Sequence, residues 1–134
     1  EDNNIHFIGP NKTTMEMMGD KITARQTVDG AGVPVIPGST DEVKSVEEIE
    51  ELAKDIGYPV VLKAASGGGG KGIRIVKERE QLAKAFKEAK SEGEKYFNDN
   101  RVYVEAFLVT EDAHYFIEMN ARIQVEHTVT EMRA

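Results

Sequence analysis

Four consecutive glycines, Gly67 to Gly70, lie between two short apolar stretches of the chain. Without Cβ atoms, such a loop lets several backbone N–H groups approach one anion. Lys63 and Lys71 add an ammonium group on each side of the loop. The β-branched residues in 60–62 and 73–76 predict a strand before the loop and a strand after it. We therefore expect this strand–loop–strand unit to hold phosphate groups.

The glycine loop has two other interpretations besides phosphate binding. A Walker A loop requires a glycine where Ala65 stands, a serine or threonine where Gly72 stands, and a helix afterwards. The residues 73–76 instead favour a strand, which excludes that motif. A hairpin loop without a ligand remains open, although turning a hairpin needs fewer glycines than this loop contains.

A second group of chemically active side chains lies near the end of the sequence. Glu118, Asn120, Arg122, Gln124 and Glu126 alternate with apolar residues, so an extended chain puts all of them on one face. The carboxylate and the amide of the first two are hard oxygen ligands suited to Mg²⁺ beside nucleotide phosphates. The guanidinium can hold a planar anion, and the last carboxylate can act as a base. A polar edge strand facing water is the alternative.

These groups need a frame of helices and strands, which the pattern of apolar residues and caps predicts. Asn11, Asp20 and Ser45 are each expected to cap a helix. Lys21 then lies in a first helical turn, where cations are uncommon, so it is either functional or a solvated surface lysine. The predicted helices are 12–18, 21–29, 46–56 and 80–96, and the predicted strands are 5–8, 33–36, 60–63, 73–76, 101–109 and 114–119.

Composition limits the classes of function. The chain has 134 residues, enough for one domain with a core, and its net charge of −7 argues against nucleic acid or a membrane surface as a partner. There is no cysteine, which excludes a disulfide framework and a cysteine nucleophile. No apolar run is long enough to span a bilayer and no signal peptide is visible. We expect a cytoplasmic protein, or a mitochondrial one in a eukaryote, and a piece of something longer.

The glycine loop and the polar cluster together resemble the biotin carboxylase family of ATP-grasp enzymes, the ATP-dependent part of acetyl-CoA, propionyl-CoA and pyruvate carboxylases. The last matching motif, from Phe116 to Met132, is highly specific for this family. The resemblance covers essentially the whole chain. The matching segments are 7–10, 18–21, 32–38, 56–60, 63–64, 67–70, 102–105 and 116–132.

The resemblance implies an ATP site. Lys21 and Lys63 match lysines that contact the phosphates of ATP, and Gly67, Gly68, Gly69 and Gly70 match a lid over those phosphates. Glu105, Ala106, Phe107 and Leu108 match the hinge strand that receives the adenine. Glu118 and Asn120 match ligands of Mg²⁺ or Mn²⁺.

The resemblance also implies a bicarbonate site and a reaction. Arg122 matches the catalytic arginine, Gln124 and Val125 match bicarbonate contacts, and Glu126 matches the general base. In the family, ATP phosphorylates bicarbonate and the carboxyl group passes to biotin on a carrier protein. The implied partners are ATP, bicarbonate, a biotin carboxyl carrier protein and a carboxyltransferase, and a homo-oligomer remains open. Fatty acid biosynthesis is the pathway expected for the acetyl-CoA branch.

The implied fold is α+β: an ATP-grasp lid subdomain, a small antiparallel sheet with two packed helices, plus a remnant strand of the large lobe. We expect N-terminal elements in 1–34, the lid in 35–107 and the remnant in 108–134. The stretch that the family has between hinge and metal strand is expected to be missing near 105–108, which leaves Ala106 where a metal carboxylate is due. The chain is therefore expected to be inactive alone. A non-catalytic, self-associating module and a piece of another ATP-grasp ligase, of the carbamoyl-phosphate or peptide type, are the alternatives.

Overall fold

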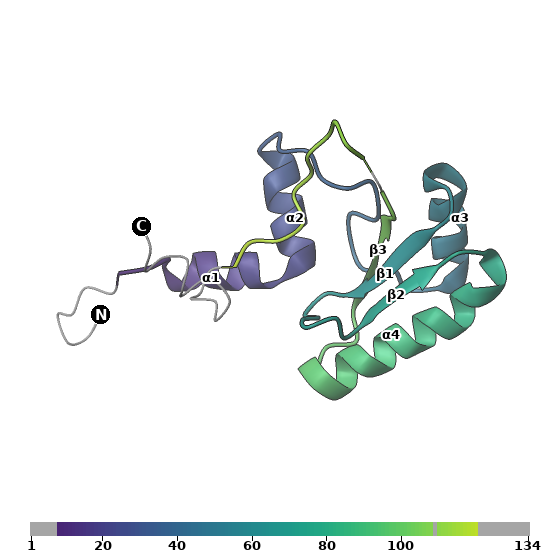
Figure 1. Cartoon of the computed structure of the whole chain (residues 1–134). Helices are drawn as coiled ribbons and strands as arrows, with labels where there is room; N and C mark the ends of the chain where they lie inside the picture. The colour runs from purple at the N-terminus through teal and green to yellow at the C-terminus, as the bar shows by residue number, and fades with distance from the viewer. Residues whose placement is uncertain (1–7, 109, 121–134) are drawn as a thin grey trace.

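The computed structural model describes residues 8–108 and 110–120. Four α-helices, one short 3-10 helix and three strands follow one another along this part of the chain (Figure 1). Their bounds are α1 Lys12–Gly19, α2 Lys21–Gly30, α3 Val46–Ile56, β1 Val60–Ala64, β2 Ile73–Val76, η1 Arg79–Gln81, α4 Leu82–Phe97 and β3 Val102–Ala106.

The strands form one antiparallel sheet in the order β2-β1-β3. Val61 of the central strand pairs with Ile75 on one side and with Glu105 on the other. The predicted strands around the glycine loop are thereby confirmed. The loop is the turn between β1 and β2, and it lies at the end of the sheet nearest α1 and α2 (Figure 1).

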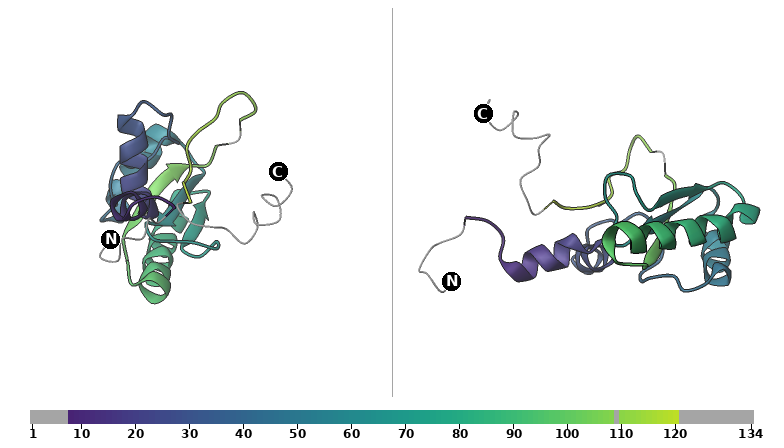
Figure 2. Two further views of the ribbon diagram at one scale, coloured as in Figure 1. Left: turned by 90° about the vertical axis from the view of Figure 1, so that its left-hand side faces the viewer. Right: turned by 90° about the horizontal axis from the view of Figure 1, so that it is seen from below.

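Alternation of side chains gives the sheet two unlike faces. On one face, α4 runs along the sheet and α3 packs beside it (Figures 1 and 2). The apolar stripes of both helices close a core there with the inward side chains of all three strands. That core contains Val43, Ile49, Ala53, Val60, Leu62, Val76, Leu82, Ala85, Phe86, Ala89, Val102 and Val104.

The opposite face of the sheet is more polar. Tyr103 packs there with Ile22 of α2 and with Ala65, which follows β1. Ile73 and Ile75 of the edge strand β2 remain exposed on this face. Helix α1 extends from α2 to the end of the molecule that lies far from α3 (Figure 2).

The helices begin where the capping residues predict. The Asn11 side chain accepts a hydrogen bond from the Thr14 backbone N–H at 2.8 Å, and Ser45 accepts one from Glu48 N–H at 3.2 Å. Each bond satisfies a backbone N–H that the first helical turn leaves without a partner. No helix in the described part of the chain is long and apolar enough to cross a membrane.

Two predicted strands are wrong. Residues 33–36 and 114–119 contribute only one isolated bridge, between Val35 and Phe116, with Phe116 N–H donating to the Pro34 carbonyl at 2.8 Å. Pro34 has no N–H to donate, and neither segment has a neighbouring strand on its other side among the described residues. The predicted strand 5–8 lies almost entirely outside the described residues.

Candidate functional site

A pocket of about 470 Å³ lies where the glycine loop, the helices α1 and α2 and the segment 118–120 meet. These segments are far apart in the sequence, and the described segment before Asn120 runs beside α2 in Figure 1. The pocket is lined by Met15, Met18, Gly19, Lys21, Ala24, Ser66, Gly67, Gly68, Gly69, Phe97, Glu118, Met119 and Asn120.

The backbone of the glycine loop explains most of its glycines. Gly69, Gly70 and Gly72 have φ values of +60°, +77° and +73°, which side chains disfavour. A Cβ on Gly67 would lie 3.0 Å from the Ala64 and Lys71 carbonyl oxygens. Gly68 is different, because its φ is outside the left-handed region and a Cβ there would meet no atom within 4 Å. The fold therefore has no need of glycine at position 68, although this residue lines the pocket.

Helix α4 holds the far end of the loop. The Gly72 N–H donates to Glu92 at 2.8 Å, and the same carboxylate accepts a bond from the Arg74 guanidinium at 2.6 Å. Hydrogen bonds from Arg74 and then from Gly72 hold the pKa of Glu92 below its usual range. Lys71, which the sequence puts at this edge, lies with its ammonium 4.0 Å from the centre of the Tyr96 ring. The loop thus returns to the sheet through a fixed attachment.

Lys21 is the cation that the structure brings to the loop. Its ammonium donates to the Gly67 carbonyl at 2.7 Å and lies 3.0 Å from a carboxylate oxygen of Glu118. The lysine is in the first turn of α2, which Asp20 caps by accepting from Thr23 N–H at 2.8 Å. Helix α2 thereby holds one charged group at the mouth of the glycine loop.

Lys63 lies elsewhere. Its side chain stands on the polar face of the sheet and forms an ion pair with Glu105 on β3, which also pairs with Arg25 of α2. Glu105 is almost fully buried, and its two cationic partners compensate the charge that burial would otherwise penalise. Burial also raises the pKa of the neighbouring Tyr103 hydroxyl. This cluster attaches α2 to the sheet beside the pocket.

The four predicted hinge residues divide at the end of β3. Glu105 and Ala106 are buried in the strand, and Phe107 and Leu108 follow it with 46% and 44% of their surface exposed. The side chain of Ala106 belongs to the sheet face that α3 and α4 cover, because it alternates with Glu105. Neither position offers a free carboxylate to the pocket.

Glu118 and Asn120, the predicted metal ligands, both line the pocket. Their oxygens are the hard donors that Mg²⁺ prefers, so the chemistry of the pair fits a divalent cation whose remaining ligands come from phosphate and water. Within 8–108 and 110–120, no group of three acidic or histidine side chains could hold a metal by itself. The predicted bicarbonate and catalytic residues Arg122, Gln124, Val125 and Glu126 lie outside the described residues.

Several residues near the pocket were not assigned to a binding site from the sequence, although Met15 and Met18 were expected on one face of the first helix. Ser66, Asp99 and Arg101 form a polar network with Asp20 beside the loop, and Met15, Met18 and Phe97 supply apolar walls. The polar run before β3 was the available signal for Asp99 and Arg101. The apolar wall could not be found from periodicity, because it gathers side chains from separate helices.

Comparison with known proteins gives a sequence family and relatives. The family described as "Carbamoyl-phosphate synthase L chain, ATP binding domain" matches residues 20–112 and 107–134. Biotin carboxylase 1, chloroplastic, from Populus trichocarpa is 48% identical over 104 residues, which cover 78% of this chain and 20% of that protein. Pyruvate carboxylase from Staphylococcus aureus is 34% identical over 202 residues. This alignment covers 96% of this chain and 18% of that protein.

A solved structure shares the fold over nearly the whole chain. It is the biotin carboxylase domain dimer of 2-oxoglutarate carboxylase from Hydrogenobacter thermophilus, in complex with MgADP, ADP and bicarbonate. The TM-score is 0.87 and the identity 31%, over 98% of this chain and 46% of the other. The chain spans about half of that domain and about a fifth of the curated relatives.

The alignments also show an internal shortening. The alignment with the pyruvate carboxylase exceeds the chain's 134 residues by 68, so the relative has at least that many residues without a counterpart here. The family matches in two segments that overlap at 107–112, just after β3. This agrees with the missing stretch that the sequence predicts next to the hinge residues.

Proposed function

The chain belongs to the ATP-grasp family of carbamoyl-phosphate synthase L chain ATP-binding domains, in its biotin carboxylase branch, and on that premise we propose that its pocket binds the phosphate groups of ATP. One observation carries the proposal. The ammonium of Lys21, the backbone of Gly67 to Gly69 and the oxygens of Glu118 and Asn120 surround one pocket. A cation, side-chain-free N–H groups and hard oxygen ligands are the groups that a metal–nucleotide complex requires.

A divalent cation, Mg²⁺ or Mn²⁺, would be held by Glu118 and Asn120 together with phosphate oxygens. When bound, it neutralises charge on the phosphate tail. Lys21 pairs with Glu118 at 3.0 Å in the structure. If the carboxylate ligates a metal, this ammonium becomes available to phosphate, so metal and nucleotide should bind cooperatively. Lys63, on the polar face of the sheet, would contact the nucleotide near its base. The adenine would lie at the end of β3, beside residues 105–108.

The reaction of the parent enzyme is part of the proposal. We expect ATP- and bicarbonate-dependent carboxylation of carrier-bound biotin through carboxyphosphate, with Arg122 holding bicarbonate, Gln124 and Val125 contacting it, and Glu126 as base. The 2-oxoglutarate carboxylase domain was solved with MgADP and bicarbonate, which supports these ligands. A biotin carboxyl carrier protein and a carboxyltransferase would be the partners, in the cytoplasm or a mitochondrion. A role in fatty acid biosynthesis would follow if the final carboxyl acceptor is acetyl-CoA.

Titration of the purified chain with ADP, with and without Mg²⁺, tests nucleotide binding. We expect measurable binding that Mg²⁺ tightens. Lys21→Met should weaken it at least about tenfold, because one charge-assisted hydrogen bond to phosphate contributes about 1.5–3 kcal/mol. Lys84→Met is the matched control, since Lys84 is 83% exposed on α4 outside the pocket. Equal affinities for the wild type and both variants would contradict the proposal.

One observation favours a second candidate, a self-associating module without nucleotide. The strand β2 is an edge of the sheet, and its Ile73 and Ile75 are 39% and 51% exposed. Exposed edges of this kind can pair with another chain. Sedimentation that shows a concentration-dependent dimer, together with no ADP binding, would support this candidate instead.

A further inference from the structure

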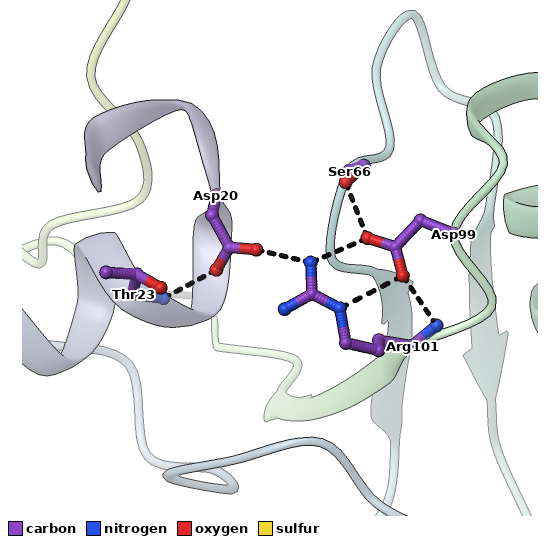
Figure 3. Close-up of polar contacts among 5 residues, drawn as sticks. All are labelled: Asp20, Thr23, Ser66, Asp99 and Arg101. Carbon is purple, nitrogen blue, oxygen red and sulfur yellow. Dashed lines mark hydrogen bonds and ion pairs between the residues drawn. The ribbon is translucent and has the colours of Figure 1, made fainter. Parts of the chain in front are cut away.

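The guanidinium of Arg101 connects two aspartates that come from distant parts of the chain (Figure 3). One of its nitrogens donates to Asp20 at 2.5 Å and to Asp99 at 2.7 Å, and Nε donates to the second oxygen of Asp99 at 3.0 Å. A planar guanidinium fixes the direction of each of these bonds, which an ammonium group cannot do.

Each aspartate also holds a wall of the pocket. Asp20 caps α2 through Thr23 and directly precedes Lys21. Asp99 accepts a bond of 2.6 Å from the hydroxyl of Ser66, which directly precedes the glycine loop (Figure 3). Arg101 therefore lies between the helix that carries the cation and the residue that precedes the loop.

Backbone hydrogen bonds join the same three segments. The Lys21 N–H donates to the Ala65 carbonyl at 3.3 Å, and the Ala65 N–H donates to the Arg101 carbonyl at 2.9 Å. The three segments are thus joined at two levels, by main chain and by side chain. The side chains of Asp20 and Asp99 are only 18% and 14% exposed, so the ion pairs are partly shielded from water.

We propose that Arg101 is a positioning residue, which fixes the distance between the Lys21 ammonium and the backbone of Gly67 to Gly69 before a nucleotide binds. The inference rests on the proposed nucleotide function. Its physical basis is pre-organisation, since a phosphate tail that meets fixed donors loses less affinity to the ordering of the loop. Arg101 does not itself line the pocket.

The test compares Arg101→Lys with the matched control Arg79→Lys, whose arginine pairs with Glu50 at 2.9 Å away from the pocket. Hydrogen–deuterium exchange without nucleotide reports on the walls, and ADP titration with Mg²⁺ reports on the consequence. In Arg101→Lys we expect severalfold faster exchange in 20–24 and 66–72 and about tenfold weaker ADP binding, as when an orienting partner is removed from a ligand-binding group. Arg79→Lys should change neither.

A second variant separates the two connections. Ser66→Ala removes only the bond from the loop to Asp99, so exchange should rise in 66–72 and stay unchanged in 20–24. Unchanged exchange in both segments of Arg101→Lys would overturn the inference whether or not the chain binds nucleotide. Faster exchange with unchanged ADP affinity would also overturn it, by showing a structural role alone. Absence of ADP binding by the wild type would overturn the proposed function, and the exchange pattern would still decide whether Arg101 couples the walls.

Discussion

At the scale of single residues, the glycine loop separates positions that the fold requires from a position that a ligand requires. Gly69, Gly70 and Gly72 adopt positive φ, and Gly67 is crowded by two carbonyl oxygens. Gly68 meets neither constraint and faces the pocket. Since nothing in the fold explains a glycine there, close approach of a bound anion to its backbone is the physical reason that remains.

Gly68→Ala should therefore leave the fold intact and weaken nucleotide binding. We expect the free energy of unfolding to change by less than about 1 kcal/mol. ADP affinity should fall by roughly tenfold or more, because a methyl group keeps the phosphate away from a charge-assisted hydrogen bond. Urea unfolding and ADP titration measure the two effects.

Gly30→Ala is the control for Gly68→Ala. Gly30 ends α2, a Cβ there meets no atom within 4 Å, and its φ is also outside the left-handed region. It does not line the pocket. A loss of affinity shared by both variants would point to a general effect of the substitution and count against the ligand contact.

At the scale of elements, the attachment of the glycine loop to the segment before β3 depends on an ionised carboxylate. Hydrogen bonds from Arg101 lower the pKa of Asp99 to about 2. Burial opposes this effect, and a hydrogen bond from Ser66 adds to it. Burial would raise the pKa of Asp20, yet hydrogen bonds from Thr23 and Arg101 hold it below its usual range. Both carboxylates are thus kept charged where the segments meet.

This attachment should weaken in acid. An unfolded aspartate has a pKa of about 3.9, so the lower folded pKa of Asp99 stabilises the protein above about pH 4. That contribution, up to about 2 kcal/mol, is lost as the pH falls towards 2. Urea unfolding at several pH values should show a shallower decline between pH 4 and 2 for Asp99→Asn than for the wild type. Asp55→Asn, at an exposed position near the end of α3, should follow the wild-type curve.

Local sequence signals predicted the elements that local contacts stabilise. The capped helices and the strands on both sides of the glycine loop follow from side-chain periodicity and cap residues, and they are confirmed. Residues 33–36 and 114–119 have strand-like composition but lack neighbouring strands in the described chain. A strand exists only through its partners, and composition does not say whether partners are present.

Only the part of the candidate site that local motifs form was predictable from the sequence. Lys21, Gly67 to Gly69, Glu118 and Asn120 belong to local motifs, and the structure brings them together in the pocket, whereas Gly70 does not line it. The contacts of Arg101 with Asp20 and Asp99, and of Lys63 with Glu105, depend on how separate segments pack. One sequence contains no record of that packing, so only the folded structure shows these contacts.

At the scale of the whole molecule, the chain spans only part of its relatives' length and still has a core of its own. Helices α3 and α4 and the three strands form a core of their own. At least 68 residues of the pyruvate carboxylase have no counterpart in this chain. The two segments of the family match overlap at 107–112, just after β3. We therefore expect this chain to bind nucleotide without turning it over.

We expect Mg²⁺-dependent ADP binding but no bicarbonate-dependent ATPase activity with free biotin above background. Glu118 is the one carboxylate among the described residues that line the pocket. The resemblance leads us to expect a further metal ligand at position 106, where the chain has an alanine whose side chain lies on the sheet face covered by α3 and α4. Charge neutralisation between the phosphates is then incomplete, and phosphoryl transfer depends on that neutralisation. A coupled phosphate-release assay measures turnover, with Lys21→Met as the control for contaminating ATPases. Turnover that requires bicarbonate and disappears in Lys21→Met would show that the shortened chain is a working catalyst.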